Sequence, residues 1–265
     1  MGRVIGIVSL KGGVGKTSVV SALGAAISEF NKKVLLVDAN FSAPNLGLHL
    51  NVVDPEVTLH DVLSMKSDIK NAIQKLDHFD LLPSSIFSRE IINPLKLRDK
   101  LKYLRRNYDF TIIDSSPALN EESLAVMLAS DELFVVTTPD HPTLSNTLKA
   151  VKLARQKGRP INGLILNKVY NKNFELSLDD IEKTAEVPIM AVLPYDVNFL
   201  KSLSEFTPST IHKPNSKASI EYKKLAATLL GEKYKPFNFK ELFRKITPPR
   251  QEINRAIFYE RVFNQ

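Results

Sequence analysis

Short runs of β-branched and other apolar residues alternate along the chain with segments long enough to form helices. The runs predict strands at residues 3–9, 33–38, 79–82, 110–114, 133–137, 161–166 and 187–193. Helices are predicted at residues 16–30, 95–107, 121–129, 143–157 and 218–230. Because the strands are continuously apolar, we expect a doubly wound α/β fold: a mainly parallel sheet with helices on both faces.

The composition changes after Gly231. Residues 232–265 contain eight Lys or Arg and four Asp or Glu, so they carry +4 of the chain's net charge of +7, and they hold five of its 14 Phe. We therefore divide the chain into a domain at residues 1–231 and a basic, Phe-rich helical extension at residues 232–265.

Two short helices are expected in this extension. Four apolar residues fall on one face of the first, at i, i+3, i+4 and i+7, with basic neighbours: Phe239, Leu242, Phe243 and Ile246. Such a helix suits an anionic membrane surface, or contact with the domain or a partner chain. Residues 251–263 predict a second helix whose apolar residues are spread around the axis, which favours protein contact.

Several classes of protein are excluded or disfavoured by composition. The chain has no cysteine, which excludes disulfides, Cys-ligated metal sites and a cysteine nucleophile. No apolar run is long enough to span a membrane, and the N-terminus lacks the pattern of a signal peptide. We expect a cytoplasmic protein, peripheral at the inner face of the membrane if the extension binds lipid. The net charge also permits weak attraction to DNA.

A glycine-rich segment joins the first predicted strand to the first predicted helix. It comprises Lys11, Gly12, Gly13, Val14, Gly15, Lys16 and Thr17, with Ser18 next. Glycines allow backbone N–H groups to turn toward a phosphate, and the helix N-terminus adds partial positive charge. In such loops the lysine reaches the β- and γ-phosphates and the hydroxyl binds Mg²⁺. The segment predicts a nucleotide-binding loop.

Leu10 stands where the common form of this loop has glycine, and a second lysine, Lys11, opens it. In this the chain resembles the deviant Walker A ATPases, the family of MinD, ParA and FlhG, over about residues 3–230, and it is most similar to archaeal MinD-like members. The resemblance implies ATP and Mg²⁺ as cofactors. It also implies a homodimer with ATP at the interface, in which Lys11 reaches the partner's phosphates like an arginine finger in trans.

Other segments match the same family. Residues 37–40 and 45–48 are similar to its switch I, and residues 112–118 resemble the Walker B strand leading into switch II. At the end of a buried strand, Asp114 can hold Mg²⁺ through water, together with Thr17. The resemblance assigns the adenine contacts to Asn167, Lys168, Pro194, Tyr195 and Asp196. Catalysis is assigned to Lys11, Lys16, Asp38, Asn40 and Asp114.

Asn40 departs from the family pattern, which places an acidic residue 24 positions after the loop lysine to position the attacking water. An amide can hydrogen-bond water but cannot take its proton. Asp38, two residues earlier on a strand, would point to the same face and could partly substitute. Our hypothesis is that ATP binding and dimerisation are intact, while hydrolysis is slow or depends on an activating protein partner.

We therefore expect a MinD-type ATPase switch that positions cell-division or other cellular machinery. Three alternatives stay open from the sequence. They are a ParA-like DNA-partition ATPase, an FlhG-like regulator that recruits a protein, and a nucleotide-dependent scaffold that does not hydrolyse ATP.

Overall fold

A single eight-stranded sheet forms the centre of the structure, a computed structural model that describes residues 2–232, 234 and 248–263. The strand order is β3-β4-β2-β5-β1-β6-β7-β8, and every pair is parallel except β3 with β4. The strands are β1 (Arg3–Val8), β2 (Val34–Ala39), β3 (Gln74–Lys75), β4 (Asp80–Leu82), β5 (Phe110–Ser115), β6 (Glu132–Thr137), β7 (Gly163–Val169) and β8 (Ile189–Pro194).

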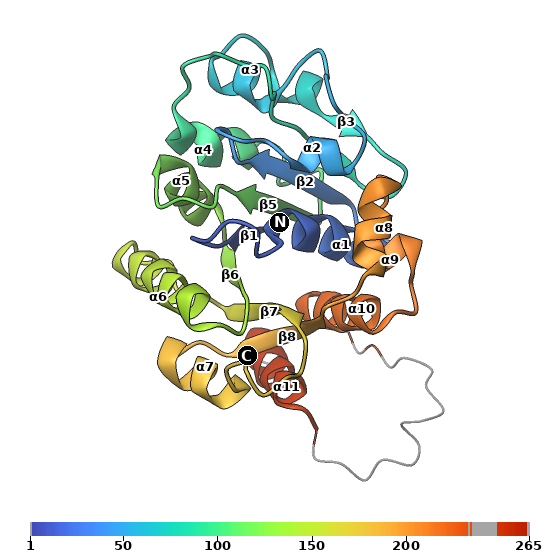
Figure 1. Cartoon of the computed structure of the whole chain (residues 1–265). Coiled ribbons are helices and arrows are strands. Elements are labelled where there is room, and N and C mark those ends of the chain that lie inside the picture. The colour runs from blue at the N-terminus through green and yellow to red at the C-terminus, as the bar shows by residue number, and fades with distance from the viewer. Residues whose placement is uncertain (1, 233, 235–247, 264–265) are drawn as a thin grey trace.

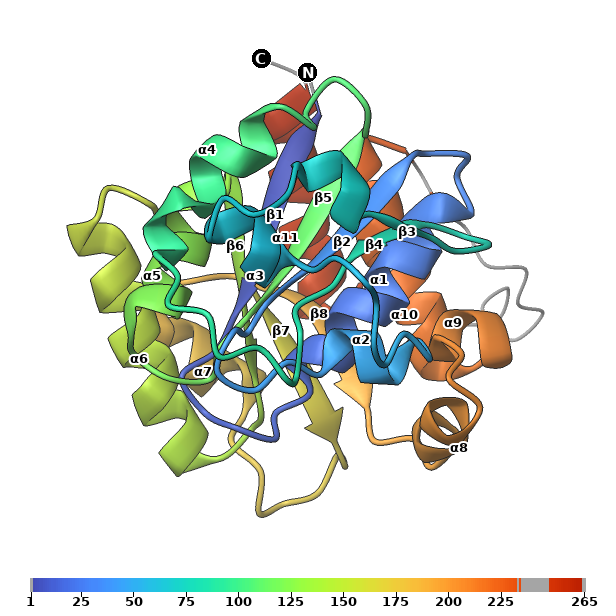
Figure 2. The same ribbon diagram turned by 90° about the horizontal axis from the view of Figure 1, so that it is seen from above.

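Helices cover both faces of this sheet (Figures 1 and 2). They are α1 (Lys16–Ser28), α2 (Leu46–His49), α3 (Leu59–Leu63), α4 (Leu97–Lys102), α5 (Glu121–Ala129), α6 (His141–Gln156), α7 (Leu178–Ala185), α8 (Asn198–Ser204), α9 (Ser209–His212), α10 (Lys217–Leu230) and α11 (Arg250–Phe263), with 3-10 turns at Ile69–Ala72 and Pro94–Lys96. The doubly wound, mainly parallel α/β fold predicted from the apolar runs is confirmed.

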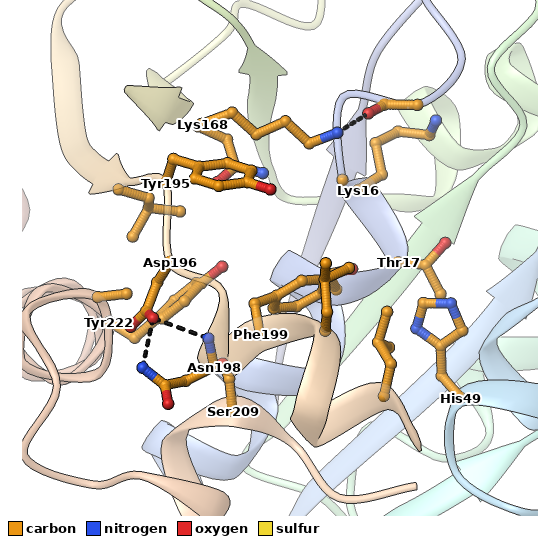
Figure 3. A pocket seen from close by; sticks show the side chains of 18 of the residues that line it. Lys16, Thr17, His49, Lys168, Tyr195, Asp196, Asn198, Phe199, Ser209 and Tyr222 are labelled. Carbon is orange, nitrogen blue, oxygen red and sulfur yellow. Dashed lines mark hydrogen bonds between the residues drawn. The ribbon is translucent and has the colours of Figure 1, made fainter. Parts of the chain in front are cut away.

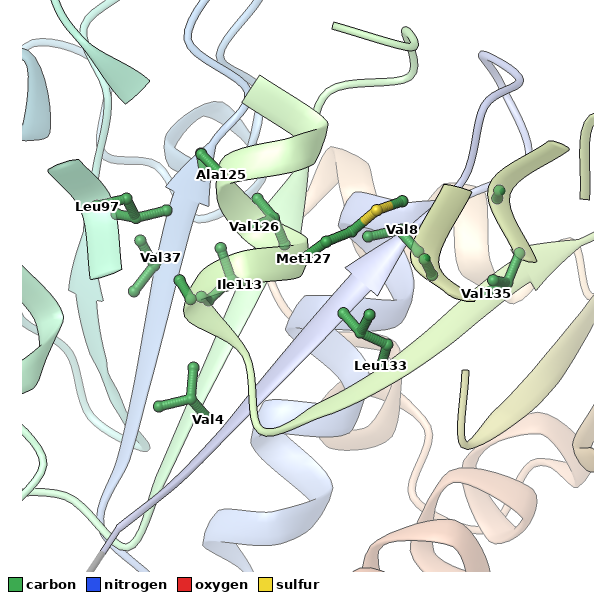
Figure 4. Close-up of a cluster of buried hydrophobic side chains, with 14 of the residues drawn as sticks. Val4, Val8, Val37, Leu97, Ile113, Ala125, Val126, Met127, Leu133 and Val135 are labelled. Atoms are coloured by element: carbon green, nitrogen blue, oxygen red, sulfur yellow. The ribbon is translucent and has the colours of Figure 1, made fainter. Parts of the chain in front are cut away.

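Two separate cores explain why the strands are apolar at consecutive positions. Side chains alternate between the faces of a strand. Val4 and Val8 of β1 belong to the core under α3–α7, part of which Figure 4 shows around α5. Ile5 and Ile7 belong to the core under α1, α10 and α11. A strand buried on both faces therefore has no polar side.

Most predicted elements are present, with two kinds of correction. The helix predicted at residues 95–107 is wrong in length, because the segment begins as a 3-10 turn and α4 ends at Lys102. The sequence reading also missed the short helices α2, α3, α7, α8 and α9, whose few residues give little periodicity. Among the described helices, none is both long and apolar enough to cross a membrane.

The second helix of the extension lies against the sheet. α11 contacts β8 and α10, and its Phe258 is buried beside Phe134 with ring centroids 6.5 Å apart. The helix therefore makes the protein contact that was expected from its spread of apolar residues. The helix predicted around Phe239, Leu242, Phe243 and Ile246 lies outside the described residues. The division of the chain at Gly231 stays a prediction.

Candidate functional site

The polar residues singled out in the sequence meet at the carboxyl ends of the parallel strands. This edge of an open α/β sheet is where ligands usually bind. A cleft of about 460 Å³ opens there (Figure 3). Twelve of the predicted nucleotide or catalytic residues line it: Gly12, Gly13, Gly15, Lys16, Thr17, Ser18, Asn40, Asn167, Lys168, Pro194, Tyr195 and Asp196.

The glycine-rich loop has a backbone that favours glycine at two of its positions. Gly13 and Gly15 have φ of 75° and 95°, in the left-handed region that other residues rarely adopt. A Cβ on Gly15 would collide with the Asn167 amide, whereas a Cβ on Gly12 or Gly13 would meet nothing within 4 Å. The loop is therefore closed toward β7 and open at Gly12 and Gly13. Val14, also predicted to bind nucleotide, is buried in the core under α1.

Lys16 and Thr17 begin α1 and bring the predicted phosphate and metal groups together. Lys16 is buried, and this burial lowers the pKa of its ammonium despite the opposing effect of Asp114. The Thr17 hydroxyl donates to Asp114 Oδ2 at 2.6 Å. Asp114 Oδ1 is buried with no hydrogen-bond partner among the described residues. An acceptor left open beside a hydroxyl ligand fits a water of a Mg²⁺ shell, so the residues present fit a magnesium nucleotide.

Asp38 holds the loop after β2 rather than facing the cleft. Its carboxylate accepts the backbone N–H groups of Asn40, Asn45 and Leu46 at 3.1, 3.0 and 2.9 Å. It pairs in register with Asp114 on β5. Burial, and then the neighbouring Asp114, raise the pKa of Asp38. Burial likewise raises the pKa of Asp114, against the effect of Lys16. Two buried carboxyls side by side favour a bound cation.

Asn40 lies just beyond the end of β2 and lines the cleft. Its Nδ2 donates to the Ala43 carbonyl, and its Oδ1 is buried without a partner among the described residues. The amide therefore presents an open acceptor, while its nitrogen donates within its own loop. The prediction that Asp38 and Asn40 share one face of a strand is therefore wrong, because β2 ends at Ala39 and the Asp38 carboxylate binds backbone N–H groups of the loop.

Lys11 is held within its own chain. Its Nζ donates to Thr143 Oγ1 at 2.6 Å and lies 3.2 Å from Asp140 Oδ1, at the start of α6. The side chains of Lys11 and Asp140 are 37% and 41% exposed. Lys11 borders a neighbouring cleft with Asp140 and Tyr170 instead of the main one. The lysine would have to leave this site to reach a second chain.

The predicted adenine segments support the loop as well as line the cleft. Asn167 Nδ2 donates to the Val14 carbonyl at 2.8 Å, and Lys168 Nζ donates to the Gly13 carbonyl at 2.7 Å. Tyr195 stacks on Tyr170 with ring centroids 4.7 Å apart. Sequence reasoning missed further lining residues from α2, α8, α9 and α10, which Figure 3 labels in part: His49, Phe199, Leu203, Ser209 and Tyr222. No local motif marks them.

Comparison with known proteins identifies the family. The model of the AAA domain family matches residues 2–162, more than half of the chain. The chain is 35% identical over 237 residues to an ATP-binding protein of Methanocaldococcus jannaschii, covering 88% of this chain and 90% of that protein. It is 32% identical over 244 residues to the septum site-determining protein MinD of Thermotoga maritima, covering 88% and 89%. The chain belongs to the MinD/ParA family of P-loop ATPases.

Solved structures of the MinD/ParA family have the same fold. The cell division ATPase MinD of Pyrococcus furiosus superposes with a TM-score of 0.80 at 35% identity, over 85% of this chain and 97% of that one. MinD of Pyrococcus horikoshii, solved with Mg-ADP, gives 0.81 at 32% identity over 93% and 100%. The predicted resemblance to archaeal MinD-like proteins is confirmed. The predicted cofactors, ATP and Mg²⁺, agree with the Mg-ADP in that relative.

Proposed function

We propose that this chain binds ATP with Mg²⁺ in the main cleft and uses the nucleotide to switch between a monomer and a face-to-face dimer. The observation that carries this proposal is the arrangement of Lys16, Thr17 and Asp114: a cation at a helix start, a hydroxyl, and a buried carboxylate with an open acceptor. Mg-ADP in the related Pyrococcus horikoshii MinD supports it.

Different residues of the cleft bind the phosphates, the metal and the base. Backbone N–H groups of the glycine-rich loop and the Lys16 ammonium hold the phosphates. Thr17 and Asp114 hold the metal, Asp114 through water, and bound Mg²⁺ neutralises charge on the phosphates. The segments at Asn167 and Tyr195 hold the base. Lys11 leaves Asp140 and reaches the phosphates of the second chain.

Slow hydrolysis is part of this proposal because Asn40 stands where the family has an acid. Replacing Asn40→Asp restores a proton acceptor and is expected to raise ATP turnover about 10-fold or more, with Asn40→Ala as control. Phosphate release by the purified full chain measures this. Rapid turnover by the natural chain without a partner would contradict it. No turnover even in Asn40→Asp, with nucleotide binding intact, would favour the scaffold that does not hydrolyse ATP.

Dimerisation and localisation are tested separately from hydrolysis. Sedimentation velocity is expected to show a dimer with ATP–Mg²⁺ and a monomer with ADP. Lys11→Ala should bind ATP yet stay monomeric, and Lys183→Ala, which changes an exposed lysine on α7 outside the cleft, should dimerise like the natural chain. A monomer with ATP in the natural chain would overturn the switch.

Pelleting with anionic liposomes, for the full chain and a chain ended at Gly231, tests peripheral membrane association through the extension. DNA serves as the competitor, since binding to DNA instead would favour the ParA-like alternative.

A further inference from the structure

A buried carboxylate in the first turn of α5 has no part in the proposed scheme so far. Glu122 is 8% exposed. Its Oε1 accepts the backbone N–H of Ser42 at 3.1 Å and also the Ser42 hydroxyl. Ser42 belongs to the loop after β2, and Glu122 to the helix after β5, 80 residues later. One side chain therefore joins the loop between the two parts of the segment similar to switch I to the helix that follows the segment similar to switch II.

Both segments border the phosphate end of the cleft. Asn40, two residues before Ser42, lines it from one side. Ser115 and Pro117, between β5 and α5, line it from the other. Asn40 is bound to its own loop through the Ala43 carbonyl, so fixing Ser42 also restrains Asn40. The position of the Asn40 side chain thus depends on a contact made outside its loop.

The charge of Glu122 is suited to a strong contact. A carboxylate in the first turn of a helix is favoured by the helix dipole, and hydrogen bonds to a charged acceptor are stronger than neutral ones. Its second oxygen, Oε2, is buried without a partner among the described residues. An unpaired buried acceptor costs stability, so Oε2 is available to a donor that approaches the loop.

We propose that Glu122 is a positioning residue for ATP hydrolysis: through Ser42 it holds the loop of residues 40–45, and hence Asn40, in place against the cleft. This rests on the proposed ATPase function. It predicts that loosening the contact slows the chemical step more than it weakens nucleotide binding, since the side-chain hydrogen bonds of Glu122 go to Ser42 and not to the phosphate loop.

The test compares three variants of the full chain. Glu122→Ala removes the contact and is expected to lower kcat about 10-fold while the Kd for ATP changes less than about threefold. Glu122→Gln keeps an oxygen that can accept from Ser42 and should recover most of kcat. Glu121→Gln changes the exposed neighbouring carboxylate and should match the natural chain. An unchanged kcat in Glu122→Ala, or a loss confined to Kd and Tm, would overturn the proposal.

Hydrogen exchange separates this proposal from the function it rests on. With ATP bound, the amides of residues 42–46 should exchange at least about fivefold faster in Glu122→Ala than in Glu121→Gln. If the natural chain shows no turnover, the ATPase proposal fails, yet faster exchange would still support Glu122 as the residue that holds the loop. Equal exchange in both variants would overturn the positioning role whatever the turnover.

Discussion

Buried carboxylates have different surroundings in two regions of this protein, the contact under α11 and the cleft. Under α11, both buried glutamates have arginine partners: Glu221 Oε1 lies 2.8 Å from Arg255, and Glu182 pairs with Arg250. Glu182 Oε1 also accepts the Ile189 backbone N–H at 2.6 Å. At or beside the cleft, four buried oxygens are left open among the described residues: Asp114 Oδ1, Asn40 Oδ1, Ser209 Oγ and Glu122 Oε2. Under α11 both glutamates are paired, and the atoms left open there are Arg255 Nη2 and Gln251 Oε1.

The difference distinguishes a structural interface from a site prepared for a ligand. Native proteins pair most of their buried polar groups, and each unpaired buried acceptor is an exception that needs an explanation, such as a bound ligand. The arginine pairs fix α11 to α7 and α10. The open acceptors at the cleft cost stability in the ligand-free chain, and they await donors such as metal-bound or attacking water. The two regions should therefore respond in opposite ways to the loss of a charge.

The largest effect is expected at α11. Arg255→Met leaves the Glu221 carboxylate buried without its cation and should lower the free energy of unfolding by about 3–5 kcal/mol, measured by urea denaturation. Adding Glu221→Gln removes the stranded charge while keeping an oxygen for the Val192 N–H, and should recover at least half of the loss. A double variant as unstable as Arg255→Met would show that the charge pair is not the cause.

A smaller effect of opposite sign is expected at the cleft. The pKa values of Asp38 and Asp114 are raised, chiefly by burial, above the ordinary value near 4. Such carboxyls take up protons on folding. Their contribution to stability is therefore complete below about pH 4 and is lost as pH rises through the raised pKa values.

The ligand-free natural chain should therefore lose stability relative to Asp114→Asn by on the order of 1 kcal/mol between pH 5 and pH 8. Urea unfolding across this range measures it, with the exposed Asp54→Asn as control. With saturating Mg-ADP the natural chain should instead be more stable than Asp114→Asn, because the variant lacks a metal-holding carboxylate. Parallel pH profiles for the natural chain and Asp114→Asn would contradict the raised pKa values.

The features that the sequence predicted depend on residues close together in the chain, whereas those it missed depend on residues far apart. The glycine-rich loop was predictable because its function depends on adjacent residues, from Lys11 to Thr17. The sheet was predictable because each strand, such as β1, is apolar throughout. The position of Asp114 at the end of a buried strand followed from the same pattern.

Contacts between distant segments were not predictable. Glu122 and Ser42 are 80 residues apart, and Lys11 and Asp140 are 129 apart. Glutamate, serine and aspartate in these positions look like ordinary surface or capping residues, and nothing local pairs them. The packing of α11 was foreseeable as protein contact from its scattered apolar residues, but the glutamates on α7 and α10 that pair with its arginines were not.

The smallest effect is expected where a charge pair is partly exposed and must break during the proposed cycle. Hydrogen bonds from Thr138, Thr143 and Lys11 outweigh the effect of partial burial and hold the pKa of Asp140 at about 2, so the pair with Lys11 persists at working pH. An exposed pair of this kind contributes about 0–1 kcal/mol. Asp140→Asn still caps α6, yet it removes the charge that holds Lys11 and leaves Thr143 Oγ1 as the partner of its ammonium. If dimerisation requires Lys11 to leave Asp140, the variant should dimerise with ATP about two- to fivefold more tightly in sedimentation equilibrium, with Asp54→Asn unchanged. Weaker dimerisation in Asp140→Asn would mean that Asp140 serves the dimer rather than holding Lys11 back from it.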